Sequence, residues 1–311
     1  KMVLILLSFC LKRVMRCIAS LGRSSVSTTG RIENILENSR LYLHYGDLTD
    51  SGCLSQLMND ILPDEVYNLA AQSHVGVSFA VPESTVDITG MGTLRLLEAV
   101  RKNCDKARFY QATSSEIFGG INEKSLNENS LIYPKSPYGC AKAFSYWITT
   151  NYREAYGMHI SNGILFNHES PRRGENFVTR KITKAVARIV AGKQKELCLG
   201  NLNAMRDWGY ALDYVEAMWM MLQQDVCDNY VVGFGEAYSV KEFVEIAFDF
   251  VGLNWENFVK HDKNLLRPSE VHHLLADTTK ARTKLGWKPK TSFRELVTLM
   301  VKADLEKEGI V

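Results

Sequence analysis

Glycine is missing from the start of this sequence. The 311-residue chain contains 21 glycines, and the first of them is Gly22. A turn that cradles phosphates at a helix N-terminus relies on glycine, because glycine lets the backbone approach the ligand closely. We therefore assign no phosphate-binding turn to residues 1–21.

Further absences narrow the class of protein. No apolar run reaches the roughly 20 residues of a membrane-spanning helix, so we expect no membrane span. The net charge is only +2, which provides no basic field for nucleic acid. Seven cysteines are scattered without C-x-x-C spacing, and no N-x-S/T glycosylation site occurs. Free thiols in a reducing compartment are the simplest interpretation. We expect a cytoplasmic protein, and we predict no metal site.

What is present is an ordinary globular composition, 46% hydrophobic and 23% charged, with ample material for a core. Strand and helix patterns alternate up to about residue 166, which favours an α/β fold with a parallel sheet and helices on both faces. The predicted strands are residues 3–5, 41–45, 65–70, 109–112, 197–199 and 230–232. The predicted helices are residues 50–62, 85–102, 177–191, 213–223, 239–250 and 291–308, with a further one starting near 138.

The most informative motif is Tyr138-x-x-x-Lys142, preceded in the chain by Ser114 and Glu116. A tyrosine and a lysine four residues apart lie on one helix face, where the ammonium would favour the phenolate and make the tyrosine a base. A hydroxyl and a carboxylate at a strand end add a second acid/base pair, which suggests proton abstraction beside a new carbonyl. Alone, the spacing is more often a solvated lysine beside a half-buried tyrosine than a catalytic pair. Its place between a strand end and a helix start favours a site.

A longer set of motifs follows in order along the chain. They are residues 46–50 (GDLTD), 67–74 (YNLAAQSH), 111–116 (QATSSE), 136–142 (SPYGCAK), 162–174 (NGILFNHESPRRG), 177–181 (FVTRK), 199–201 (LGN), 206–209 (RDWG), 213–218 (DYVEAM) and 267–270 (RPSE). From about residue 23 onward, the chain resembles the GDP-mannose 4,6-dehydratase family of extended short-chain dehydrogenases/reductases. The resemblance implies a Rossmann-type doubly wound parallel sheet with a smaller, interleaved α/β substrate domain.

The resemblance also implies a reaction. Tyr138 would take the proton of the sugar 4-hydroxyl while hydride passes from C4 to NADP, and Lys142 would hold the nicotinamide ribose. Glu116 would then remove the C5 proton, water would leave from C6, and hydride would return to C6. Ser114 would hydrogen-bond the 4-oxygen. The product would be GDP-4-keto-6-deoxymannose.

Binding residues are carried over by position. The resemblance implies that the cofactor contacts Arg23, Ser24, Ser25, Asp47, Leu48, Leu69, Ala70, Ala71, Gln72, Ser73, Ser84, Tyr138, Lys142, His168 and Arg173. It implies that GDP-mannose contacts Ser114, Glu116, Asn167, Lys181, Arg206, Arg267 and Glu270. The cations among these could instead be solvated surface residues. Met218 to Met221 are expected to pack in the core or at an interface.

The sequence departs from the family at its beginning. The family opens with a strand and a glycine-rich turn into a helix, and about ten residues of that unit have no counterpart between Ile5 and Leu6. Either a segment is absent from the printed sequence, or the deletion is real and weakens cofactor binding.

The expected domains are residues 1–168 with 207–237 for the dinucleotide, and 169–206 with 238–311 for the nucleotide sugar. A homodimer or homotetramer is expected. Two alternatives to the dehydratase stay open: a catalytically silent paralogue without a phosphate-binding loop, and a related nucleotide-sugar dehydratase or epimerase. Glu116 argues against an epimerase, which needs no base for C5.

Overall fold

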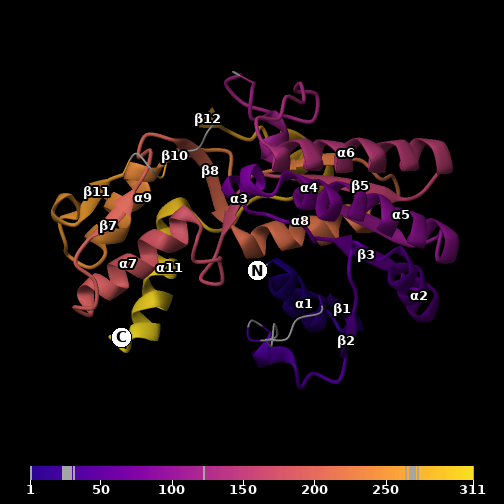
Figure 1. Ribbon diagram of the computed structural model, residues 1–311, viewed down its shortest axis with the longest axis horizontal. Coiled ribbons are helices and arrows are strands. Elements are labelled where there is room, and N and C mark those ends of the chain that lie inside the picture. Colours follow the sequence, from indigo (N-terminus) through magenta and orange to yellow (C-terminus); the bar gives the residue numbers. More distant parts are fainter. Residues whose placement is uncertain are drawn as a thin grey trace.

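A parallel four-stranded sheet forms the main framework of the chain, in the order β3-β4-β5-β9 (Figure 1). The computed structural model describes residues 2–22, 30, 32–121, 123–262, 265, 271 and 273–310. The strands of this sheet are β3 (Glu65–Asn68), β4 (Arg108–Ser114), β5 (Ile160–Leu165) and β9 (Asn229–Val232). Residues 230–232 therefore join the main sheet beside β5.

Helices cover both faces of this sheet, which confirms the predicted α/β fold class. One face carries α2 (Ser51–Ile61), α3 (Val75–Ala80), α4 (Pro82–Val86), α5 (Gly92–Asn103) and α6 (Pro137–Tyr156). The other carries α1 (Met2–Lys12), α8 (Ala211–Gln223) and α10 (Thr279–Leu285). Parallel strands need this double cover because both of their faces are apolar. Within the described ranges, no helix is long and apolar enough to cross a membrane.

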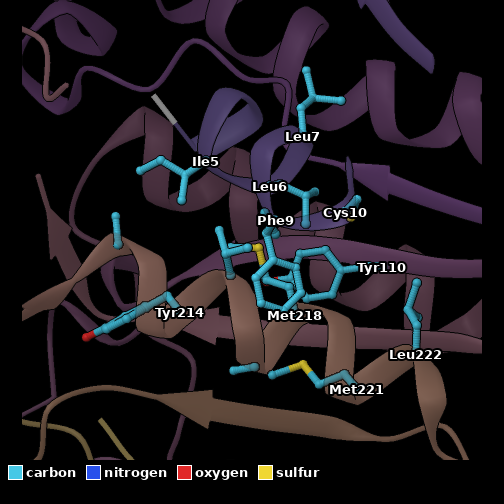
Figure 2. Packing of buried hydrophobic residues seen from close by; sticks show 14 of the residues in the cluster. Ile5, Leu6, Leu7, Phe9, Cys10, Tyr110, Tyr214, Met218, Met221 and Leu222 are labelled. Carbon is cyan, nitrogen blue, oxygen red and sulfur yellow. The ribbon is translucent and has the colours of Figure 1, made fainter. Parts of the chain in front are cut away.

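The first helix corrects one prediction. Residues 3–5 were expected to form a strand, but they lie inside α1. The segment from Met2 to Lys12 contains neither glycine nor proline, so nothing interrupts a helix there, and a short apolar run cannot by itself distinguish a buried strand from a buried helix. The apolar side of α1 packs on the sheet and on α8, where Phe9 and Met218 meet Tyr110 (Figure 2).

The strands β1 (Cys17–Leu21) and β2 (Leu41–Tyr45) form a separate parallel pair. Among the residues that the structure describes, no strand bridges this pair to β3. In the common Rossmann order 3-2-1-4-5-6, the first strand occupies that central position. The two sheets here match that order with its first strand left out.

The helix predicted for residues 85–102 is interrupted. The chain is α-helical in α4, makes a π-helical turn at η2 (Asp87–Met91), and resumes in α5. The turn brings the backbone close to its neighbours, since a Cβ on Gly92 would lie 2.8 Å from the Cβ of Leu48. A regular pattern of apolar residues does not reveal such a bulge.

A second core lies beside the main sheet. The helices α7 (Val178–Val190), α9 (Val240–Asp249) and α11 (Phe293–Glu308) pack around it. Its strands are β6 (Asn167–Glu169), β8 (Met205–Tyr210), β10 (Ala237–Ser239) and β12 (His273–Leu274), with β7 (Leu197–Leu199) and β11 (Val259–His261) as a separate pair. Short 3-10 turns are η1 (Glu33–Ile35), η3 (Ser115–Phe118) and η4 (Trp255–Asn257). A capping box of Ser239 and Glu242 starts α9, at the position where the sequence predicts that this helix begins.

Candidate active site

The end of β4 places a hydroxyl and a carboxylate side by side. Ser114 is the last residue of the strand, and its Oγ accepts a hydrogen bond from the backbone N–H of Glu116 at 3.3 Å. This bond starts the 3-10 turn η3, which carries Glu116. The sequence pattern therefore has a local cause, because a serine at a strand end can cap the following turn.

The start of α6 presses against that turn. Ser136 caps the helix by accepting a hydrogen bond from the N–H of Gly139 at 3.0 Å, and Pro137 occupies the first turn. A Cβ on Gly139 would lie 2.9 Å from the carbonyl oxygen of Glu116. Glycine is needed here because any side chain would push α6 away from η3. This close contact brings Tyr138 next to Ser114 and Glu116.

Tyr138 and Lys142 are both buried in α6. The Lys142 Nζ donates a hydrogen bond to the carbonyl oxygen of Ala112 at 2.6 Å, and it lies 6.0 Å from the centroid of the Tyr138 ring. Burial lowers the pKa of Lys142 to about 8, because an ammonium loses hydration inside the protein. The ammonium is thus anchored to β4 below the tyrosine.

The groups around Tyr138 shift its pKa in opposite directions. Burial raises the pKa of Tyr138 to about 12, and the charge of Glu116 adds to that rise. A hydrogen bond with Ser114 and the positive charge of Arg173 act in the opposite direction. The sequence assigned the favourable charge to Lys142. In the structure, Arg173 adds a second positive charge that lowers the pKa of Tyr138.

These residues line one cavity of about 240 Å³. The predicted residues that line it are Leu69, Ala71, Ser73, Ser114, Glu116, Tyr138, Lys142, Asn167, His168 and Arg173. Most of them follow the carboxyl ends of β3, β4 and β5, where open parallel sheets bind their ligands, whereas Tyr138 and Lys142 come from α6 and Arg173 from the loop after β6. A shallower hollow of about 460 Å³ between Pro171 and α11 contains none of the predicted site residues.

The loop after β5 supplies one wall of the cavity. The His168 Nδ1 lies 2.9 Å from the carbonyl oxygen of Phe166, and the His168 ring is 5.3 Å from the ring of Tyr214. The hydroxyl of Tyr214 donates to the carbonyl oxygen of Asn167 at 3.4 Å. These contacts fix the orientation of β6, so His168 and Asn167 are held against the cavity.

Other predicted residues lie outside this cavity. Ala70 and Gln72 alternate with the lining residues after β3, and Ser84 is exposed on α4. Asp47 and Leu48 follow β2, where the Asp47 carboxylate accepts from the N–H of Thr49 at 2.9 Å.

The lysine and arginine predicted to contact GDP-mannose do not line this cavity. Lys181 is half-buried on α7, and Arg206 is buried on β8, where its Nη1 donates to the Met205 carbonyl at 2.8 Å. The remaining predicted residues are Arg23, Ser24, Ser25, Arg267 and Glu270, and they lie outside the described residues.

Sequence reasoning missed several lining residues. Met2 and Val3 reach the cavity from α1, and Phe177 reaches it from the residue before α7. Met218 was assigned to packing; it is buried in the core and also borders the cavity. An aromatic residue just ahead of a helix, after an arginine-rich loop, was the available signal for Phe177.

The cavity suits one end of a dinucleotide. Tyr138, Lys142 and the backbone after β3 surround a space where a nicotinamide nucleotide fits between an acid/base group and a cation. At the α1 side, the lining is apolar Met2 and Val3. Residues 2–22 contain no glycine-rich turn for a diphosphate, so within the described part of the chain only the nicotinamide end can be recognised.

Comparison with known proteins decides the family. A family model described as GDP-mannose 4,6 dehydratase matches residues 5–300. GDP-mannose 4,6 dehydratase 1 of Arabidopsis thaliana is 53% identical over 294 residues, covering 91% of this chain and 81% of the plant protein. The chain belongs to the GDP-mannose 4,6-dehydratase family. The human GDP-mannose 4,6 dehydratase is 50% identical over 310 residues, covering 91% and 83% of the two chains.

Family membership confirms the resemblance read from the motifs. It favours a GDP-mannose dehydratase over an epimerase or another nucleotide-sugar dehydratase. The reason is that the relatives that are 50% and 53% identical to this chain are named GDP-mannose 4,6 dehydratases. The fold agrees with a solved structure of RMD from Pseudomonas aeruginosa complexed with NADPH. That structure has a TM-score of 0.78 at 24% identity, and the match covers 86% of this chain and 91% of that one.

Proposed function

We propose that the chain dehydrates GDP-mannose to GDP-4-keto-6-deoxymannose with NADP as its cofactor. The observation that carries the proposal is the meeting of Ser114, Glu116 and Tyr138 at one cavity. Oxidation of an alcohol needs one acid/base group, and elimination at the neighbouring carbons needs a second one. Membership of the GDP-mannose 4,6-dehydratase family supports the same reaction.

Tyr138 acts at the sugar 4-hydroxyl. Its phenolate removes the hydroxyl proton, and the Ser114 hydroxyl hydrogen-bonds the oxygen that becomes the 4-ketone. Because the Ser114 hydroxyl is close enough to Tyr138 to lower its pKa, one substrate oxygen can contact both side chains. Burial excludes water from this exchange, which strengthens each hydrogen bond at the reacting atoms.

Glu116 acts at the next carbon. The 4-ketone makes the C5 hydrogen acidic, and the carboxylate removes it as a proton. The electron pair left at C5 forms a double bond to C6 as the C6 hydroxyl departs, and the proton held by Glu116 leaves with it as water. A carboxylate beside the tyrosine serves this step, whereas a simple alcohol dehydrogenase needs none.

Bound NADP would supply the hydride acceptor for C4 and the hydride donor for C6, so no cofactor would be consumed. As C6 gains the hydride, C5 takes up a proton from solvent, which completes the 4-keto-6-deoxy sugar. The residues proposed to hold it within the cavity are Leu69, Ala71, Ser73, Tyr138, Lys142, His168 and Arg173. Ala70, Gln72, Asp47, Leu48 and Ser84 are proposed to extend this contact, together with Arg23, Ser24 and Ser25. For GDP-mannose, the proposed contacts beyond Ser114 and Glu116 are Asn167, Lys181, Arg206, Arg267 and Glu270.

We further propose that the chain self-associates through the outer side of α4 to α6. Phe144 and Trp147 of α6 are exposed, and Val86 and Met91 are exposed next to that helix. An apolar patch of this kind is typical of an interface. A dimer or tetramer would cover it, and sedimentation analysis of a Trp147→Glu variant tests this against the parent chain.

Two further proposals concern organisation. The division into residues 1–168 with 207–237 and 169–206 with 238–311 is supported by two separate cores, although Ala281, Leu285 and Trp287 of the last range pack in the core of the main sheet. A cytoplasmic location is supported by the seven cysteines, all of which are free thiols.

A mass-spectrometric assay tests the reaction. The chain is incubated with GDP-mannose and NADP in heavy water, and a product lighter by one water that carries deuterium at C5 is expected. Glu116→Gln should lower the rate by about 10²- to 10⁴-fold, while Glu83→Gln on the exposed side of α4 should not. Faster turnover of a dTDP- or UDP-glucose than of GDP-mannose would overturn the proposal.

The catalytically silent paralogue is the second candidate, favoured by the apolar α1 side of the cavity. It predicts no NADP binding in the micromolar range, which corresponds to about −8 kcal/mol. Calorimetry with NADP decides between the two.

A further inference from the structure

The turn after β3 is bound to the rest of the protein through its backbone N–H groups. This turn, residues 69–73, supplies three of the residues that line the cavity. The N–H of Ala70 donates to Oδ1 of Asn68 at 3.3 Å, and the N–H of Gln72 donates to the hydroxyl of Thr89 at 3.2 Å. Side-chain acceptors therefore hold the turn at two places, and the residues that alternate with these two line the cavity.

Thr89 is brought to the turn by the π-helical segment η2. Here the N–H of Gly92 donates to the carbonyl of Asp87, five residues earlier, so the regular α-helical pattern is broken. Turns of this kind frequently occur at functional sites. Thr89 is only 1% exposed. Its own carbonyl oxygen accepts from two hydroxyls, those of Thr93 at 2.8 Å and Ser145 at 2.9 Å.

These hydroxyls connect Thr89 to the catalytic helix and to β3. Ser145 lies on α6, three residues after Lys142. Thr93 lies on α5, and its hydroxyl accepts from Nδ2 of Asn68 at 3.2 Å. Asn68, Thr93 and Ser145 are at most 2% exposed. Because buried polar groups are costly unless they are hydrogen-bonded, these bonds join the turn after β3, the π turn and α6 into one unit.

We propose that Thr89 is a positioning residue for the NADP-binding turn: its hydroxyl holds the N–H of Gln72, and Ser145 ties Thr89 to the helix that carries Tyr138 and Lys142. The inference rests on the proposed function, because residues of this turn are proposed to contact the cofactor. Thr89 is not among the residues that line the cavity, so it acts through the turn. The π turn has a role in this arrangement, since it carries the hydroxyl to Gln72.

Amide hydrogen exchange tests the bond without cofactor or turnover. Thr89→Val replaces the hydroxyl by a methyl group of similar size, so the N–H of Gln72 loses its acceptor while the packing volume is kept. In the chain free of NADP, the Gln72 amide should then exchange at least about 5-fold faster, as expected for the loss of one hydrogen bond. Thr89→Ser keeps the hydroxyl and should exchange at a rate close to that of the parent. Residue-resolved mass spectrometry measures these rates.

Thr149→Val is the matched control. Thr149 is also buried, on α6, and its hydroxyl bonds Oδ1 of Asn162 at 2.8 Å. Among the described interactions it has no contact with the turn, so this variant should leave the exchange of Gln72 unchanged. Ser145→Ala gives an independent test and should raise the exchange of Gln72 by a smaller factor, since Ser145 acts through Thr89. Equal exchange of Gln72 in the Thr89→Val and Thr149→Val chains overturns the inference.

The affinity for NADP gives a second readout. Calorimetry should show a Kd for NADP at least about 5-fold higher in Thr89→Val, restored in Thr89→Ser and unchanged in Thr149→Val. A parent chain that binds no NADP refutes the proposed function, and the exchange rates then decide by themselves whether Thr89 holds the turn. A parent that binds NADP, with the same Kd in Thr89→Val and Thr149→Val, refutes the positioning role alone.

Discussion

Replacing one member of a buried ion pair in the second core should strongly lower the free energy of unfolding. Arg180 on α7 pairs with Asp304 on α11, and their side chains are 4% and 3% exposed. The Thr183 hydroxyl also donates to Oδ2 of Asp304 at 2.8 Å. Removing one member of a buried pair leaves the other charge without compensation and costs about 3–5 kcal/mol. We therefore expect Asp304→Asn to lower the free energy of unfolding by that amount.

An exposed pair that also involves a residue of α7 supplies the control. Lys184 lies 2.6 Å from Glu175, but these side chains are 37% and 59% exposed. An exposed pair contributes about 0–1 kcal/mol, so Glu175→Gln should cost no more than that. The double variant Arg180→Met/Asp304→Leu fills the space with apolar groups. It should come within about 1 kcal/mol of the parent, since burying two charges is itself costly.

Urea unfolding measures all three variants. Tryptophan fluorescence is a suitable signal, because Trp208 is buried in the second core and reports on this part of the chain. Two results would refute the reasoning. If Asp304→Asn cost as little as Glu175→Gln, the charge would not be buried in solution. If the double variant lost as much as the single one, side-chain packing would be the cause.

Three other predictions follow from single contacts. Gly139→Ala should lower kcat by at least about 10-fold. A Cβ there would lie 2.9 Å from the carbonyl oxygen of Glu116, and small displacements of catalytic groups slow a reaction strongly. Steady-state kinetics tests this, with an unchanged far-UV circular dichroism spectrum as the control for folding. Asp207→Ala should lower the free energy of unfolding by about 3 kcal/mol in urea titrations, because its carboxylate accepts from three backbone amides. Lys142→Met should change the pH dependence of stability. The pKa of Lys142 is lowered to about 8 in the folded chain, so its burial penalty is present at low pH and is relieved as pH rises from about 8 to about 10.5. The parent should gain up to about 3 kcal/mol over that window, and the variant should not.

The alternation of strands and helices was readable because its signals are local. Residues 41–45 and 197–199 form strands with the predicted bounds, and Asp50 caps α2 as its position before the first helical residue indicates. A parallel strand is a short apolar run between turn residues, and a covering helix shows a 3.6-residue period. Neither signal depends on distant parts of the chain.

The failures have different physical causes. Residues 3–5 and the residues next to them are all apolar, so the pattern could not distinguish a buried strand from the buried helix α1. The π turn at η2 depends on close packing against Leu48 and Phe144, which are distant in sequence. The strand β8 was missed because its sequence, MRDWGY, has two adjacent charged residues and a glycine and shows no apolar alternation. Its pairing with β6, β10 and β12 is set by tertiary contacts.

The catalytic residues were predictable as a set, but their electrostatics were not. Tyr138 and Lys142 are four residues apart, so the sequence shows that they share a helix face. It cannot show that the Lys142 ammonium is bound to the Ala112 carbonyl. Nor does it show how Arg173 is placed, with its Nε 3.1 Å from Oε2 of Glu169 and its guanidinium over the Phe177 ring. These contacts depend on long-range geometry.

The buried ion pair and the cavity are connected through α7. The Arg180–Asp304 pair ties this helix to α11, and the first turn of α7 carries Thr179, whose hydroxyl donates to Glu169. Glu169 lies 3.1 Å from Arg173, which lines the cavity together with Tyr138. A loss of the buried pair should therefore displace Arg173 at the cavity as well as destabilise the second core. A loss of the exposed pair between Lys184 of α7 and Glu175 should do neither, because that pair has no contact with Glu169 among the described interactions.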